Sequence, residues 1–220
     1  MMFKKILSLL AMMSIAQIVS AANLSLLMTH DSKTIAANGV TSTVHYQERM
    51  YRQEQQLWIE RVIPTKVYQA KEAHHDGEHK HLDLESSARW VTKQPNGASL
   101  RLVNRHDKQI VNVTTGDYDA VGFDGQWLST YSLIDPQQLK TMTLSKRVAP
   151  TGSQWYETTK EGRYLRVLWD TKLAIPRRME SGQVDGTQQH TIQIDIQPTT
   201  AMPWLALKGY QEKEYSDFLD

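Results

Sequence analysis

The chain has 220 residues and is nearly neutral, with 25 basic and 24 acidic side chains, and it contains no cysteine. The lack of cysteine excludes disulfide bonds, thiol catalysis and thiolate ligands, so any metal site must use nitrogen and oxygen. The basic residues are scattered and form no stripe, which argues against nucleic acid and anionic membrane surfaces as partners.

The N-terminus has the pattern of a cleavable secretory signal. Lys4 and Lys5 precede an apolar run over 6–19, and Val19-Ser20-Ala21 offers small residues at the cleavage position. The alternative, an uncleaved anchor, needs an apolar run of roughly 20 residues, and this one is shorter. We therefore predict cleavage after Ala21 and a soluble periplasmic protein without a membrane span. We also predict no lipid anchor, because no cysteine is present to carry one.

The mature chain, 22–220, has no long helical stripe and is predicted to form one mainly antiparallel β domain. Asn23–Gly39 does not have the pattern of an amphipathic helix, and we interpret it as a flexible N-terminal segment. Two hairpins are predicted in the first half: 43–51 with 57–62, and 89–92 with 98–103 across Asn96-Gly97. Two further strands are predicted at 109–113 and 126–131.

One short helix is predicted from Asp135, as N-cap, and Pro136 to about Met142. The strands predicted after it are 144–148, the hairpin 154–158 with 163–169, and the hairpin 177–181 with 189–196. In the last strand Ile192, Ile194 and Ile196 share one face, as in a sheet with one buried side. Residues 201–220 carry a tryptophan-containing apolar cluster and then an exposed acidic tail.

Half of the eight histidines lie between 74 and 81, interleaved with carboxylates. Imidazole and carboxylate together suit zinc or copper, although protonated imidazole cannot bind. The residues predicted to bind metal are His74, His75, Asp76, Glu78, His79 and His81. The spacing also matches the H-x-x-E-H motif of one zinc-peptidase family, but Gly77 within it opposes the required helix. The alternative to metal binding is a solvated surface loop.

The sequence contains no nucleophile elbow, phosphate-binding glycine loop or dinucleotide fingerprint, so we predict a non-enzymatic protein with no catalytic or cofactor-binding residues. Six tryptophans are many for this length, and most lie in predicted strands. They either fill the core of a large sheet or line a concave face that holds an apolar ligand.

The final third of the chain resembles a known superfamily. The segments 162–170, 173–180 and 185–196 follow a cadence of strand, aspartate turn, Leu-x-x-Pro-like corner, strand, Asp-Gly turn and strand. This cadence resembles the later hairpins of periplasmic lipoprotein-carrier-like proteins, the superfamily of LolA, LppX-type proteins and RseB. The resemblance implies a single curved antiparallel sheet, half-barrel-like, with one or two short helices on its concave face, where those proteins hold acyl chains or lipidated peptides.

Three functions follow from these observations. The first is an exported binding protein that buffers or delivers zinc or copper through the histidine window. The second is a lipoprotein-carrier-like protein that binds an apolar or acyl ligand in the concave face of its sheet. The third is an accessory protein that acts through a partner protein of the cell envelope.

Overall fold

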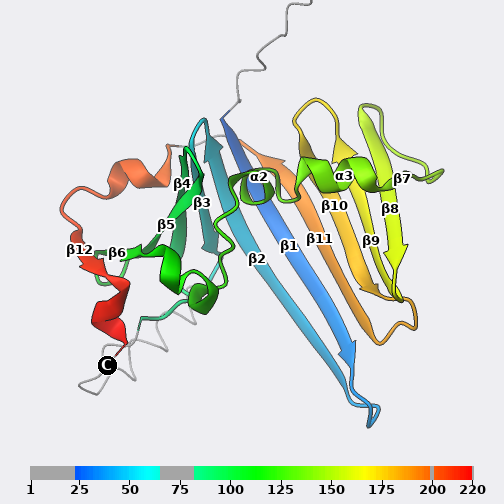
Figure 1. Ribbon diagram of the computed structural model, residues 1–220, viewed down its shortest axis with the longest axis horizontal. Coiled ribbons are helices and arrows are strands. Elements are labelled where there is room, and N and C mark those ends of the chain that lie inside the picture. The colour runs from blue at the N-terminus through cyan, green and yellow to red at the C-terminus, as the bar shows by residue number, and fades with distance from the viewer. Residues whose placement is uncertain (1–22, 65–81, 199–200, 220) are drawn as a thin grey trace, which may run out of the picture.

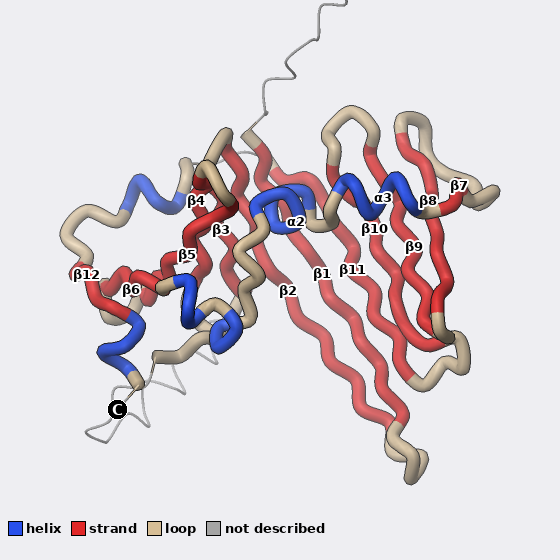
Figure 2. The backbone as a smooth tube through the Cα atoms, viewed as in Figure 1, coloured by secondary structure: helices blue, strands red, loops and turns tan. Residues whose placement is uncertain are grey.

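The computed structural model describes residues 23–64, 82–198 and 201–219. The predicted signal segment and the six predicted metal ligands lie outside these residues. The described residues form one open, curved, twelve-stranded sheet (Figures 1 and 2). Its strand order is β12-β6-β5-β4-β3-β2-β1-β11-β10-β9-β8-β7. The predicted fold class, a curved mainly antiparallel sheet with one or two short helices, is therefore confirmed.

Nearly every neighbouring pair of strands is antiparallel; β12 and β6, which pair in parallel, are the exception. The strands of the first half are β1 (Leu24–Ile35), β2 (Thr41–Gln53), β3 (Gln56–Arg61), β4 (Ala88–Gln94), β5 (Gly97–Asn104) and β6 (Gln109–Val113). The strands of the second half are β7 (Thr143–Leu144), β8 (Ser153–Lys160), β9 (Arg163–Asp170), β10 (Ile175–Gln183), β11 (Gln188–Gln197) and β12 (Gln211–Glu214). The four predicted hairpins are all present, each extended by a few residues.

Two short α-helices occur among the described residues, and both belong to the connection between β6 and β7. Helix α3 (Pro136–Thr141) begins where predicted, because the Asp135 carboxylate accepts a hydrogen bond from the Gln137 N–H at 2.8 Å. We call residues 114–142 the strap, since this segment crosses one face of the sheet (Figure 1). We call the covered side of the sheet the strap face and the other side the outer face.

Three sequence predictions were wrong. Residues 126–131 form not a strand but most of helix α2 (Trp127–Ser132), because Trp127 and Tyr131 lie four residues apart and pack together on one helix face. The segment 24–35 is not flexible; it is β1, and its alternate residues Leu24, Leu26 and Met28 are buried. The predicted strand 144–148 shrinks to the two residues of β7.

Each face of the sheet carries a buried apolar cluster. The largest core cluster lies under the strap, where Val121, Phe123 and Trp127 pack against strap-facing residues such as Leu26 and Met28. A second cluster lies on the outer face, where Met202, Trp204 and Leu207 of the C-terminal segment cover Tyr51 and Trp58. The tryptophans thus serve mainly as core residues, and this explains their number.

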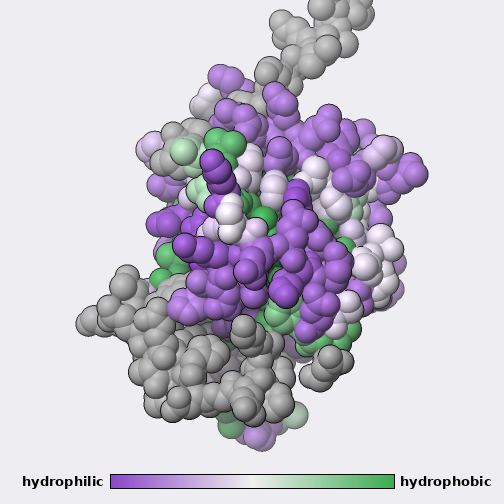
Figure 3. Space-filling view, turned by 90° about the vertical axis from the view of Figure 1, so that its left-hand side faces the viewer, coloured by the Kyte–Doolittle hydropathy of each residue, from purple (hydrophilic) through white to green (hydrophobic). Residues whose placement is uncertain are grey.

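The ends of the sheet are protected against strand addition. β7 has two residues, and β12 has four, all exposed, with the sequence Gln-Glu-Lys-Glu. Short, charged edge strands disfavour pairing with other chains. The side of the molecule that carries β12 has a largely hydrophilic surface interrupted by small hydrophobic areas (Figure 3).

The buried guanidinium of Arg52, on β2, connects three separate parts of the fold. It donates hydrogen bonds to the Tyr131 carbonyl of α2 at 3.1 Å and to the Leu173 carbonyl between β9 and β10 at 3.0 Å. It also lies over the Tyr131 ring, 4.3 Å from the ring centroid. Arg52 is only 4% exposed, and this burial lowers the pKa of its guanidinium. A buried cation needs such acceptors, so Arg52 fixes the strap against the sheet.

Replacing Arg52 with methionine is expected to lower the free energy of unfolding by about 2 to 4 kcal/mol, because two buried carbonyls lose their charged donor. Urea denaturation followed by tryptophan fluorescence measures the change. The matched control is Arg49→Met on the same strand, where the side chain is exposed on the outer face. Equal effects of the two substitutions would contradict the anchoring role.

Candidate functional site

The strap is held to the sheet by specific contacts along its length. At its start, the Tyr118 hydroxyl donates to the Ala98 carbonyl at 3.1 Å, and Arg89 donates to the Val121 carbonyl at 2.9 Å. Gly97 lies so close to the strap that a Cβ there would stand 2.8 Å from the Gly125 carbonyl oxygen. Arg52 then holds α2. These polar contacts fix the strap against the sheet. The strap therefore forms one edge of the surface beside it.

Helix α3 continues the strap over the second half of the sheet. Its Leu139, with Ile134 and Met142 beside it, packs on Val167 and Trp169 of β9. These residues form a separate apolar cluster with partly buried Leu165 and Met179 at its margin. The margin of this cluster is where apolar surface emerges from beneath the strap.

The strap face changes from apolar to polar along β9, β10 and β11. Because side chains alternate between faces, every second residue of each strand belongs to the strap face. Moving away from the strap, the successive rows are Ile192–Met179–Val167, then His190–Ser181–Leu165, then Gln188–Gln183–Arg163. Val167 is fully buried, Ile192, Met179 and Leu165 are half-buried, and Arg163 is exposed. An amphipathic surface therefore lies open beside the strap.

Four planar side chains cross the strap face from β3 to β11. The His30 ring stacks on Tyr46, with centroids 4.4 Å apart and planes at 5°, and on His190 at 5.6 Å and 22°. The Arg61 guanidinium lies 4.2 Å from the centroid of the Tyr46 ring. The buried His30 Nε2 lies 3.0 Å from Glu48 Oε2, but among the described residues neither ring nitrogen makes an aligned hydrogen bond.

His190 is the last side chain of this row and lies at the polar end of the surface. Burial lowers the pKa of its imidazole, the nearby His30 lowers that pKa further, and Asp31 opposes both effects. The ring is therefore neutral at pH 7 and offers one donor and one acceptor.

A groove of about 480 Å³ lies at this polar end and draws on β1, β9, β10 and β11. Its strap-facing residues include Ser32, Ser181, Gln188, His190 and Arg163. No carboxylate belongs to the lining of the groove among the described residues. The groove is thus rich in hydrogen-bond donors, and two cationic residues line it: Arg163 on the strap face and Lys33, whose position on β1 belongs to the outer face.

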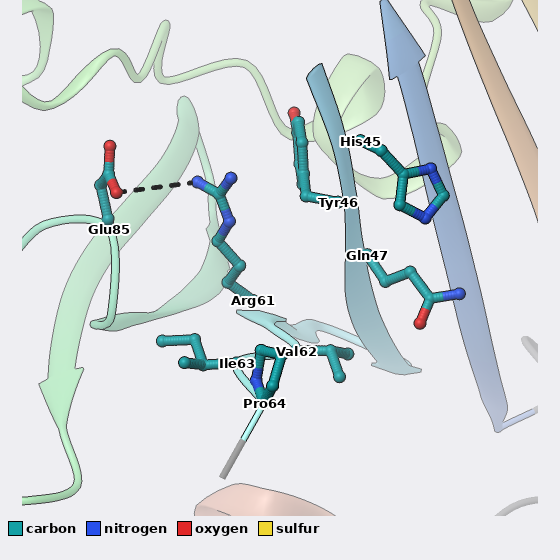
Figure 4. A pocket seen from close by; sticks show the side chains of 8 residues that line it. All are labelled: His45, Tyr46, Gln47, Arg61, Val62, Ile63, Pro64 and Glu85. Carbon is teal, nitrogen blue, oxygen red and sulfur yellow. Dashed lines mark ion pairs between the residues drawn. The ribbon is translucent and has the colours of Figure 1, made fainter. Parts of the chain in front are cut away.

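A second groove, of about 440 Å³, lies where β2 extends beyond β3 (Figure 4). Tyr46 and Arg61 form one part of its wall, and Val62, Ile63 and Pro64 form another. Arg61 is 3.9 Å from the Glu85 carboxylate, and both side chains are solvent-accessible. This groove borders the point at which the described chain stops, after Pro64.

An ion-pair network covers part of the outer face of β8 to β10. Glu180 accepts hydrogen bonds from Arg147 at 3.0 Å and Arg178 at 2.8 Å, and Arg166 lies 3.7 Å away. Partial burial raises the pKa of Glu180, but the hydrogen bonds from the two arginines outweigh it and hold that pKa below its usual value. The Arg147 guanidinium also covers the Trp155 ring at 3.9 Å. These charged groups and the half-buried Leu168 occupy the outer face of these strands.

The predicted metal ligands His74, His75, Asp76, Glu78, His79 and His81 lie outside the described residues, and the prediction stands untested. Asp83, which follows the window, uses its carboxylate to accept the N–H groups of Glu85 and Ser86 at 3.0 and 3.1 Å. Within 23–64, 82–198 and 201–219, no group of three or more His, Asp or Glu side chains is placed to hold a metal ion. In the same residues, no helix is long and apolar enough to cross a membrane.

The sequence did not reveal the strap-face residues as a set. His30 and His190 were interpreted as isolated, yet β1 pairs with β11 and stacks their rings. The alternation of Leu24, Leu26, Met28 and His30 was the available indication that His30 belongs to a buried strand face.

Comparison with known proteins gives structural likenesses alone. No family model matches the sequence, and no curated protein matches it. Among solved structures, an uncharacterized conserved protein from Thermus thermophilus is 11% identical with a TM-score of 0.42, over 87% of this chain and 90% of that one. A chain of the Pseudomonas aeruginosa MucA/MucB complex is 14% identical with a TM-score of 0.39, over 85% of this chain and 56% of that one.

A LolA superfamily protein from Nitrosomonas europaea is 7% identical with a TM-score of 0.35, over 84% of this chain and 90% of that one. The superfamily that the hairpin cadence resembles is thus among the structural likenesses. Because these TM-scores are below 0.5, the functional argument rests on the geometry of this chain.

Proposed function

We propose that this protein is an exported, non-enzymatic binding protein that holds an elongated apolar ligand, such as an acyl chain, on the strap face beside α3. The observation that carries the proposal is the row of half-buried apolar side chains Ile192, Met179 and Leu165, which emerges from under the strap. Sites for small apolar ligands combine such surface with a few polar groups, and both are present here.

The arrangement of the strap supports this proposal. A ligand that lies along β9 to β11 would extend the apolar cluster of Ile134, Leu139 and Met142 without displacing α3. Each methylene removed from water stabilises binding by about 0.8 kcal/mol, so a long chain gains enough to offset its ordering. The ion pairs of the outer face offer no comparable surface.

Replacing Met179 with glutamate is expected to weaken binding of a fluorescent acyl probe by at least about tenfold, because a carboxylate would lie against the chain. Fluorescence titration of the untagged protein measures the affinity, and circular dichroism checks that each variant folds. Val148→Glu is the control, since Val148 is 95% exposed and lies outside the site. Met179→Ala, which adds no charge, should lose much less affinity.

Lipid extraction of the purified protein followed by mass spectrometry gives a second readout. An acyl compound that co-purifies with the wild type and with Val148→Glu, but not with Met179→Glu, would support the proposal. Equal probe binding by all variants would refute it, because the apolar row would then play no part in binding.

A second candidate function is transition-metal binding by the histidine window, favoured by the concentration of half of the histidines between 74 and 81. We propose zinc or copper as the ion, because imidazole suits both. This function would be independent of the strap face, and the two could coexist in one protein.

Calorimetric titration with Zn(II) and Cu(II) tests this second function on protein without a His-tag. Replacing His74, His75, His79 and His81 with alanine should abolish micromolar or tighter binding, because the imidazole ligands are gone. A variant with alanine at His45 and His106 is the control for nonspecific surface binding. If the four-histidine variant binds as the wild type does, the window is a solvated loop without a metal role.

A further inference from the structure

The polar end of the strap face has features that the apolar ligand alone does not explain. The groove over β1, β11, β10 and β9 includes His190 and Ser181, which lie in the same row as Leu165, so its polar side chains adjoin the proposed acyl surface. Its volume is about 480 Å³, and its lining is mostly polar. An amphiphile that lies along these strands would bring its head group into this groove.

The side chains of the groove fit an anionic head group. Ser32 and Ser181 offer hydroxyl donors, Gln188 offers an amide donor, and His190 offers one ring N–H. Arg163 supplies a guanidinium, which binds carboxylate and phosphate through parallel N–H groups. The permanent charge of Arg163, with no carboxylate in the lining of the groove among the described residues, favours an anionic group over a cationic one.

Arg163 is available for such a ligand. The other strap-facing arginines are already engaged: Arg52 and Arg89 donate to carbonyls, and Arg61 pairs with Glu85. Among the described residues, Arg163 has no ion pair.

The nearest carboxylates already have partners. Glu161, in the turn before β9, lies 3.8 Å from Lys160. Asp185, in the turn between β10 and β11, accepts the N–H and the hydroxyl of Thr187 at 2.9 and 2.7 Å. On the outer face, Asp31 lies 2.7 Å from His45. These pairings leave the positive charge of Arg163 uncompensated in the groove.

We infer that the ligand of the strap face is an anionic amphiphile, whose carboxylate or phosphate head is held by Arg163, His190, Ser32 and Ser181 in this groove. The inference rests on the proposed function and adds to it the chemical class of the ligand. It also gives the ligand a direction, with its tail beside α3 and its head in the groove at the far ends of β9 and β10.

The test compares palmitate with its methyl ester, two ligands with the same tail and different head charge. The wild-type protein should bind palmitate about tenfold more tightly than the ester, the factor expected for one charge-assisted hydrogen bond. In Arg163→Gln this preference should disappear, while the affinity for the ester stays unchanged. Arg166→Gln is the control, because it removes the same charge from the same strand on the outer face.

Each outcome of this comparison has a separate meaning. Equal binding of palmitate and ester by the wild type would overturn the anionic head group and leave acyl binding intact. Absence of binding for both would overturn the proposed function and the head-group inference with it. If inorganic phosphate alone binds in an Arg163-dependent way and palmitate does not, the groove is a site for a free oxyanion and the amphiphile is refuted.

Discussion

The buried guanidinium of Arg52 is the contact on which the arrangement of this protein depends. It lies on β2 and donates to carbonyls 79 and 121 positions later in the sequence, in α2 and in the turn before β10. A charge that is buried in this way is tolerated only when acceptors surround it. The strap must therefore cross the sheet at this position. On one side of the crossing, over β2 to β6, the sheet face is a closed core; on the other side, over β9 to β11, it is an open surface.

The open surface follows from the lengths of the elements. β9, β10 and β11 have eight to ten residues, whereas α3 has six and covers one end of these strands. The strand ends beyond α3 are thus uncovered, and their residues change from Val167 through Leu165 to Arg163 along a single strand. The uncompensated charge of Arg163 beside a groove favours a ligand, because an isolated sheet margin has no need of a groove.

Local chemistry determined which parts of the fold were predictable from sequence. The four hairpins depend on neighbouring residues and turn signals, such as Asn96-Gly97, and α3 depends on its Asp135 cap. The predictions for the segments of α2 and β1 were wrong because tertiary packing determines the structure of both. Trp127 packs into the sheet core, and β1 lies between β2 and β11. The candidate site was not predictable, since β1–β11 pairing places Ser32 beside His190 from the opposite end of the sequence.

The two proposed functions involve different parts of the chain, so each can be tested by substitutions that leave the residues of the other unchanged. The surface proposed to hold the acyl chain lies on β9 to β11, whereas the segment that contains the histidine window joins the described chain after Pro64, next to β3, and before Leu82. A charge at Met179 changes no residue of the window. Among the described residues, the Arg61–Tyr46–His30–His190 row reaches from the groove near Pro64 to the polar groove, so side-chain contacts connect the two ends of the strap face.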